Sequence, residues 1–229
     1  MTTWRHFPGA QAASLLARTA RAPRRSISSV GLASVAVFVF AISGMAGEVK
    51  ISFLPPPLEG TISLGIYDRD GKLVRVLRRE AELAEFEVAP DALRTTWDGR
   101  NDSGVQVPPG KYSAHGFAVG DLHVEQVTGS GSETNKASVK LVANPLSGAK
   151  RETVDLVAGL DEDGSFLQTT DGLPLFTVDE EQDIISVSLA QRGDKSLELC
   201  QNDGDTTDCF TITGIDQMMM FDAGDFELK

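Results

Sequence analysis

Two clusters of oxygen-bearing side chains suggest the first chemistry in this sequence, which is the binding of a hard cation. They are Asp161, Glu162 and Asp163 before Gly164, and Asn202, Asp203 and Asp205 around Gly204, with Asp208 beyond. Carboxylate and amide oxygens around a glycine are typical of calcium loops. Neither cluster has flanking helices or a closing bidentate glutamate, so acidic hairpin turns explain both equally well. Calcium at either cluster is the only cofactor that the sequence suggests.

The sequence has two cysteines, Cys200 and Cys209, separated by the polar run 201–208. Strand-like residues flank them at 196–199 and 210–213, so the pair is expected at the base of a hairpin loop. In an oxidising compartment the natural inference is a disulfide that clamps this loop. Two unpaired thiols are the alternative.

The remaining reactive side chains do not form a catalytic pattern. His115 and His123 have no third metal ligand in view and are expected at the surface or edge of a sandwich. Gly129-Ser130-Gly131 lacks the full Gly-x-Ser-x-Gly pattern of a nucleophile elbow. Met218–Met220 are expected to pack in a core. A hydrolase would rest on the abundance of carboxylates alone, and the sequence therefore predicts a protein that is not an enzyme.

The charge of the chain is unevenly distributed. The whole sequence has a net charge of −12, but its first 47 residues hold five arginines and no acid, so the remainder carries −17. Residues 152–229 contain nineteen Asp and Glu against three Lys and Arg. Such a region repels nucleic acid and anionic lipid and favours cations or basic partners. Acids that simply keep an all-β protein soluble are the alternative explanation.

The N-terminal region has the order of an export signal. Arg24-Arg25 precedes a short polar run and then the apolar stretch Val30–Ala46, which ends in small residues. A signal peptidase could cut after Ser43 or after Ala46. Because the apolar stretch is at the lower length limit for a membrane span, residues 1–47 are either a cleaved signal peptide or an uncleaved signal anchor. The protein is therefore expected to be exported, as a periplasmic, secreted or cell-surface protein.

The elements that must position these groups are short strands. Apolar runs occur at 62–66, 73–77, 86–88 and 112–119, and turn residues such as Asp70-Gly71 and Asp102-Ser103-Gly104 separate them. Strands at this spacing are typical of an antiparallel sandwich. Trp97 is the largest apolar side chain between these turns and is expected to fill the space between the sheets.

The run from Ile62 to Leu77, ISLGIYDRDGKLVRVL, and the run from Trp97 to Tyr112, WDGRNDSGVQVPPGKY, resemble the immunoglobulin-like domain of the flagellar hook-capping protein. This domain is also a module of many secreted bacterial proteins. The resemblance covers residues 50–125 and implies an Ig-like β-sandwich. It implies no catalytic residue, since every residue of the two motifs has a structural role.

The sequence predicts an all-β chain with an Ig-like antiparallel β-sandwich at 48–127, a flexible linker at 128–142 and an acidic β-rich region at 143–229. In the last region, strand-like runs at 165–168, 175–178, 184–189, 197–199 and 210–213 alternate with acidic turns. Their rhythm is similar to the opening of a propeller blade, but the region is too short for the four blades of a closed propeller.

We therefore expect an exported, non-catalytic structural or binding protein that acts as a spacer, scaffold or adhesion unit at the bacterial cell envelope. Its partner would be a protein or glycan there, not nucleic acid, and it would meet the membrane only through an N-terminal anchor. Two alternatives are the first part of a larger propeller-bearing cell-surface protein and a glycan-active hydrolase that uses acidic residues.

Overall fold

The computed structural model describes residues 48–129, 131, 134–146 and 153–229, so the predicted export segment lies outside the described residues. All described residues fall in one unit of the chain, Gly44–Lys229. Within them the fold is all-β, as predicted, with one short 3-10 helix at Leu83–Glu85. No helix among the described residues is long and apolar enough to cross a membrane.

The first sandwich consists of two antiparallel sheets, with strand orders β1-β5-β4 and β15-β6-β2-β3. The strands are β1 (Val49–Phe53), β2 (Thr61–Asp68), β3 (Leu73–Ala81), β4 (Glu87–Ala89), β5 (Ala92–Trp97), β6 (Gly110–Val119) and β15 (Met218–Leu228). Side chains of both sheets fill one core. Trp97 lies at its centre, as predicted, and its indole N–H donates to the carbonyl oxygen of Arg100 at 2.8 Å.

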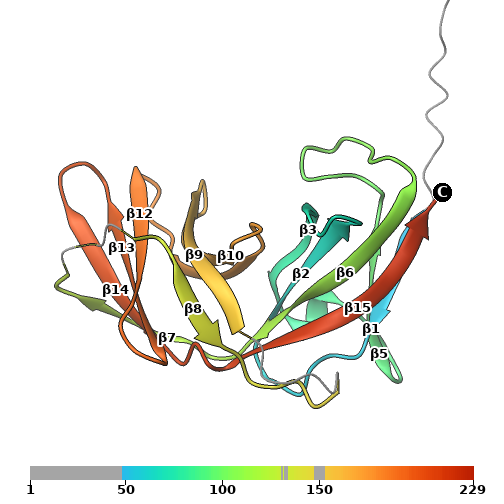
Figure 1. Cartoon of the computed structure of the whole chain (residues 1–229), viewed down its shortest axis with the longest axis horizontal. Coiled ribbons are helices and arrows are strands. Elements are labelled where there is room, and N and C mark those ends of the chain that lie inside the picture. The colour runs from blue at the N-terminus through green and yellow to red at the C-terminus, as the bar shows by residue number, and fades with distance from the viewer. Residues whose placement is uncertain (1–47, 130, 132–133, 147–152) are drawn as a thin grey trace, which may run out of the picture. The chain divides into compact units, whose positions relative to one another are not determined.

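Strand β15 belongs to the first sandwich although it comes from the C-terminal end of the chain. It pairs with β6 from Met218 opposite Val119 to Leu228 opposite Gly110, and Figure 1 shows it in red beside β6. Phe221 enters the first core, where its ring stacks on Phe53 with the centroids 4.8 Å apart. The sheets therefore do not divide between residues 127 and 143, because the final strand of the acidic region completes the first sandwich.

The predicted turns of the first sandwich are present. The Asp68 carboxylate accepts the backbone N–H groups of Asp70 at 2.9 Å and Lys72 at 3.0 Å. Gly71 follows with φ of 77°, and Gly104 closes the later turn with φ of 73°. Glycine fits these positive φ angles without the strain that a side chain would add. These two turns set the lengths of β2 and β3 and of the loop before β6.

The second sandwich also consists of two antiparallel sheets, with strand orders β11-β10-β9-β8 and β12-β13-β14-β7. The strands are β7 (His123–Val127), β8 (Ala137–Lys140), β9 (Thr153–Asp161), β10 (Gly164–Thr169), β11 (Pro174–Asp179), β12 (Ser186–Gln191), β13 (Ser196–Asn202) and β14 (Thr207–Thr213). Side chains from both sheets share one core. The acidic region, in which the sequence indicated propeller-like repeats, therefore forms most of a second sandwich. Its four-stranded meander β8–β11 packs on the sheet β12-β13-β14-β7.

The predicted linker at 128–142 is partly built into this second sandwich. Strand β8 lies within it and pairs with β9, and the Asn135 side chain exchanges two hydrogen bonds with the backbone of Ala158, at 2.9 and 3.2 Å. Strand β7, which the sequence assigned to the first domain, pairs with β14. The chain thus passes between the sandwiches twice, from β6 to β7 and from β14 to β15. The polar composition of residues 128–135 did not indicate that β7 and β8 would pair within the second sandwich.

Cys200 on β13 and Cys209 on β14 are directly opposite each other and form a disulfide, as predicted. Their Cα atoms are 4.1 Å apart, and both residues are buried. Gly129 lies against the bond, since a Cβ atom at this position would be 2.4 Å from the Cys209 sulfur. A glycine is thus required for the segment after β7 to cover the disulfide.

The role of β15 predicts the effect of a core truncation. Phe221→Ala should lower the free energy of unfolding by roughly 3 to 5 kcal/mol, because it empties a packed site in the first core. Trp97 is the only tryptophan after residue 47, so its fluorescence in a denaturant titration reports on this core. The control Val105→Ala removes an exposed side chain and should change stability by less than about 0.5 kcal/mol. Equal stability of the two variants would contradict the pairing of β15.

Candidate functional site

The sheet β15-β6-β2-β3 has an outer face that lies opposite the first core. Along β6, Tyr112 and Ala114 belong to the first core, whereas Ser113, His115 and Phe117 alternate to the outer face. Phe117 is part of the second core. The outer face is therefore covered at the Phe117 end of β6 and more open at the Ser113 end, and the candidate site lies where the cover stops.

Tyr67 lies on this outer face, and its ring stacks on that of His115. The centroids are 3.6 Å apart and the planes differ by 9°. The tyrosine ring also lies over Gly65, where a Cβ atom would be 2.8 Å from the ring and 2.9 Å from the hydroxyl oxygen. The absence of a side chain at Gly65, two residues earlier on the same face of β2, is what lets Tyr67 lie flat against the sheet.

The hydroxyl of Tyr67 is buried without a hydrogen-bond partner, and the residue is 1% exposed. Burial raises the pKa of Tyr67, and the carboxylate of Asp171 raises it further, so the hydroxyl stays protonated. The carboxylate also attracts the hydroxyl proton and so contributes to the raised pKa, although no contact of the hydroxyl meets the geometry of a regular hydrogen bond. A buried hydroxyl without a partner costs about 1 to 3 kcal/mol. This group therefore requires an explanation other than stability.

Asp171 reaches the site from the turn between β10 and β11. The hydroxyl of Thr169 donates to its carboxylate and accepts the backbone N–H of Leu173 at 3.0 Å. Gly172, with φ of 98°, lets the chain reverse directly after the acid. The side chain of Asp171 is thus held by a turn whose own hydrogen bonds are complete.

His115 is uncharged near pH 7. Partial burial lowers its pKa below the usual value, although the carboxylates of Asp171 and Asp222 act in the opposite direction. Asp222 is its direct neighbour across the β6–β15 pair. A neutral imidazole can accept a hydrogen bond as well as donate one.

Together these groups line a pocket of about 550 Å³ between the outer face and strands β9 and β10. Tyr67, His115, Phe117 and Met220 come from the first sandwich, and Asp155 and Asp171 are among the residues from the second. Lys136 at 2.7 Å and Ser138 at 2.8 Å hydrogen-bond to Asp155 and lower its pKa. The lining combines aromatic and apolar side chains with hydroxyls and carboxylates, and the volume lies in the usual range of ligand sites.

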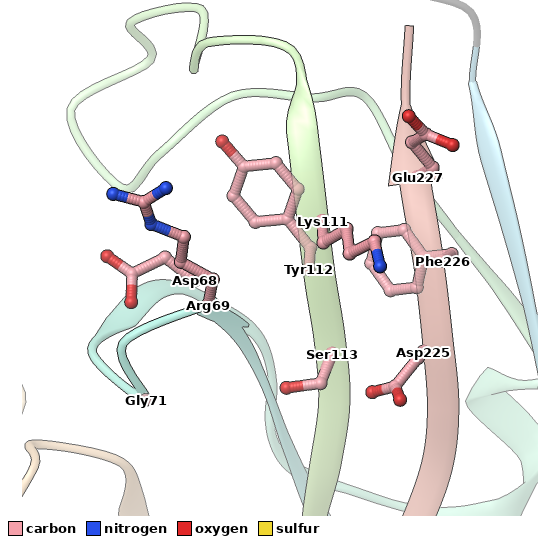
Figure 2. Close-up of a pocket in the computed structure, with 9 residues that line it drawn as sticks. All are labelled: Asp68, Arg69, Gly71, Lys111, Tyr112, Ser113, Asp225, Phe226 and Glu227. Atoms are coloured by element: carbon pink, nitrogen blue, oxygen red, sulfur yellow. The ribbon is translucent and has the colours of Figure 1, made fainter.

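A second hollow lies at the open end of the same face and is shown in Figure 2. Ser113 on β6 and Asp225 on β15 are paired neighbours there, and Arg69 approaches from the β2–β3 turn. The hydroxyl of Tyr112 donates to the carbonyl oxygen of Pro108 at 2.7 Å. None of the partnerless buried polar atoms in the described residues lines this hollow. It therefore extends the outer face but is a weaker candidate than the Tyr67 pocket.

The first predicted calcium cluster lies against an arginine. Arg79 donates to Asp161 at 2.6 Å and approaches Asp163 at 3.5 Å. Its guanidinium also lies over the ring of Phe166, 4.6 Å from the centroid. A calcium ion at Asp161 and Asp163 would have to displace this guanidinium. Calcium here stays a prediction that the contacts do not require.

The second predicted calcium cluster forms the β13–β14 turn. The side-chain oxygen of Asn202 accepts the backbone N–H of Gly204 at 2.9 Å. Asp203 accepts the backbone N–H groups of Thr206 and Asp205, which lower its pKa. Asp208 accepts a hydrogen bond from Gln126 at 3.0 Å. These contacts account for the oxygens of Asn202, Asp203 and Asp208 as turn and strand contacts, and calcium remains a prediction here too.

Among the described residues, one group of three Asp, Glu, His or Cys ligand atoms lies close enough to hold a metal, at Glu198, Cys200 and Cys209. The two cysteines of this group are bonded to each other, so their sulfurs are not available as thiolate ligands. The group therefore does not support a metal site in the described part of the chain.

Sequence reasoning missed the Tyr67 pocket for a reason that can be stated. Tyr67 and His115 were assigned structural places in the sandwich, and Asp171 was assigned to an acidic turn. Gly65 before Tyr67 was the available local signal, because a glycine in a strand indicates a close approach. Nothing local indicated that Asp171 would lie beside them.

The fold and the pocket define the class of this chain only as an all-β protein with two sandwich cores and a disulfide in its described part. Comparison with protein-family models, curated proteins and solved structures found no significant match. The resemblance of residues 50–125 to the hook-capping Ig-like domain therefore stays a prediction.

Replacing Tyr67 by phenylalanine separates a structural from a functional hydroxyl. Tyr67→Phe should leave the free energy of unfolding unchanged or raise it by about 1 kcal/mol, because it removes a buried group that has no partner. The matched control Tyr112→Phe removes the hydrogen bond to Pro108 and should lower stability by about 1 kcal/mol. Denaturant titrations followed by Trp97 fluorescence measure both. A loss for Tyr67→Phe as large as the control's would show that the hydroxyl is bonded in the native state.

Proposed function

We propose that this chain is an exported, non-catalytic binding protein of the bacterial cell envelope, and that it contacts its ligand at the Tyr67 pocket. The observation that carries the proposal is the buried hydroxyl of Tyr67, which has no partner and lines a ligand-sized pocket. A bound ligand would supply the missing hydrogen bond. The two sandwiches would serve as the rigid scaffold, as in the Ig-like modules that residues 50–125 resemble.

The expected location outside the cytoplasm rests on two properties of the chain. The Cys200–Cys209 disulfide is typical of proteins that fold in an oxidising compartment. The basic and apolar order of residues 1–47 is that of an export signal. The two properties are independent, since one concerns redox chemistry and the other the composition of the N-terminus.

The ionisation states in the pocket favour binding over catalysis. The raised pKa of Tyr67 keeps its hydroxyl protonated, so it is a poor nucleophile and a poor base. Thr169 is buried, and its hydroxyl is held by hydrogen bonds with Asp171 and Leu173. What remains is a set of hydrogen-bond donors and acceptors beside apolar side chains, which is suited to holding a ligand.

Mass spectrometry of the protein from the envelope fraction of a bacterial host tests export. We expect an N-terminus at Gly44 or Gly47, after cleavage, and a mass two hydrogens lower than that of the dithiol chain because of the Cys200–Cys209 bond. An intact N-terminus in the membrane fraction would support the signal anchor instead. Recovery of the chain in the cytoplasm with both thiols reduced would contradict export.

A ligand panel tests binding at the pocket. Neutral, anionic and amino glycans and short peptides should be added to the isotope-labelled mature protein, with the amide NMR signals of Tyr67 and His115 observed. We expect at least one class of ligand to move both signals, to bind more weakly to Tyr67→Phe, and to be recovered unchanged. Product formation that Asp171→Asn abolishes would establish the hydrolase alternative. Ligands that move only distant signals would contradict the proposed site.

A further inference from the structure

The ligand chemistry of the Tyr67 pocket can be narrowed from its lining, and this step rests on the proposed binding function. The carboxylates of Asp155 and Asp171 line the pocket, whereas no lysine or arginine does. Asp222 adds a third acid beside His115. An anionic ligand would be repelled by this arrangement.

Asp171 carries the larger share of the negative charge that a ligand would meet. The ammonium group of Lys136 lies 2.7 Å from Asp155 and offsets the charge of that acid. The polar groups found beside the Asp171 carboxylate are the neutral hydroxyls of Thr169, which donates to it, and of Tyr67. Its charge therefore has no cationic partner among the ion pairs of the described residues.

The other polar groups of the pocket can accept hydrogen bonds. The Tyr67 oxygen has lone pairs and no partner, the neutral imidazole of His115 offers a nitrogen lone pair, and the exposed hydroxyl of Thr170 lies at the rim. A ligand rich in N–H donors would match these acceptors. A guanidinium group has five N–H donors, no acceptor and a permanent positive charge.

The molecule itself contains an example of this mode of recognition. The guanidinium of Arg79 lies over the ring of Phe166, with its centre 4.6 Å from the ring centroid, and contacts the carboxylates of Asp161 and Asp163. An aromatic ring beside acids thus already holds a guanidinium elsewhere in this fold. The lining of the Tyr67 pocket also includes aromatic side chains and acids, but no arginine.

We infer that the Tyr67 pocket binds a guanidinium group, with Asp171 as its ion-pair partner and the Tyr67 oxygen as an acceptor. The hollow of Figure 2 continues along the same sheet face beyond Ser113, so an arginine side chain in a partner polypeptide could enter the pocket while its backbone lies along β6. A free guanidine such as agmatine would use the same contacts within the pocket. The two sources differ only in what they touch outside it.

Titration of the mature protein with N-acetyl-arginine-methylamide tests the inference. The matched neutral ligand is N-acetyl-citrulline-methylamide, which has nearly the same shape without the charge. We expect the arginine ligand to bind at least about tenfold more tightly and to move the amide signals of Tyr67 and His115, because a partly desolvated ion pair contributes more than about 1.4 kcal/mol. An arginine-centred pentapeptide and agmatine distinguish the sources, since only a peptide should also move the signals of Ser113 and Asp225.

Substitutions test whether Asp171 and Tyr67 are the groups that bind the arginine ligand. Asp171→Asn should weaken arginine binding about tenfold, whereas Asp194→Asn, which removes an equal charge from an exposed turn residue, should leave it unchanged. Tyr67→Phe should weaken binding severalfold without loss of stability. Acidification well below 6.5, the ordinary pKa of histidine, should also weaken binding, because His115 gains a charge beside Asp171, Asp222 and Tyr67 and repels the ligand.

Three results would overturn the guanidinium inference. They are equal affinity for the arginine and citrulline ligands, an equal effect of Asp171→Asn and Asp194→Asn, and arginine binding that leaves Tyr67 and His115 undisturbed. A neutral glycan that moves the Tyr67 and His115 signals when arginine does not would also overturn it, but would leave the proposed binding function intact. If no ligand of any class moves these signals, the proposed function fails as well.

Discussion

Both cores depend on the alternation of side chains along β6 and β15. Ala114 and Phe117 lie on opposite faces of β6, and Phe221 and Met218 do so on β15, so each strand supplies one residue of each pair to each core. A shift of one residue in the pairing would exchange the faces. It would direct polar side chains such as His115 into the first core. The register of this one pair therefore fixes the two cores and the candidate site together.

The pocket exists because the second sandwich covers the outer face of the sheet β15-β6-β2-β3 only at the Phe117 end of β6. Contacts from β3 hold the two sandwiches at that position: the Glu80 carboxylate accepts the backbone N–H and the hydroxyl of Thr177, at 2.8 and 2.6 Å, and Arg79 pairs with Asp161. Glu80 has φ of 47°, a conformation that costs a side-chain residue about 1 to 3 kcal/mol. The hydrogen bonds to Thr177 offset this strain. They keep the β11 edge against β3, and hence Asp171 near the outer face.

Contacts between residues close together in the chain were predictable from the sequence, whereas the pairing of strands far apart in the chain was not. The Asp68 turn, the burial of Trp97 and the Cys200–Cys209 bond each follow from residues close together in the chain or from one large side chain. The pairing of β15 with β6 does not follow from nearby residues, because the alternation of apolar and polar side chains along β15 fits either sandwich equally well. For the same reason, the sequence did not indicate that strand pairs would cross the predicted division at 128–142. The contact between Tyr67 and Asp171 required that pairing to be known first.

An unpartnered hydroxyl is not a site by itself, as the first core shows. Thr95 also lacks a hydrogen-bond partner, but it faces the core on β5 and lines none of the pockets described above. Trp97 and Tyr112, which also carry polar groups on buried aromatic rings in that sandwich, both donate to backbone carbonyl oxygens. Tyr67 differs from all three because its hydroxyl combines burial, a neighbouring carboxylate and an adjoining cavity. Phenylalanine would pack equally well over Gly65, and the proposed ligand would give the hydroxyl a role that packing does not.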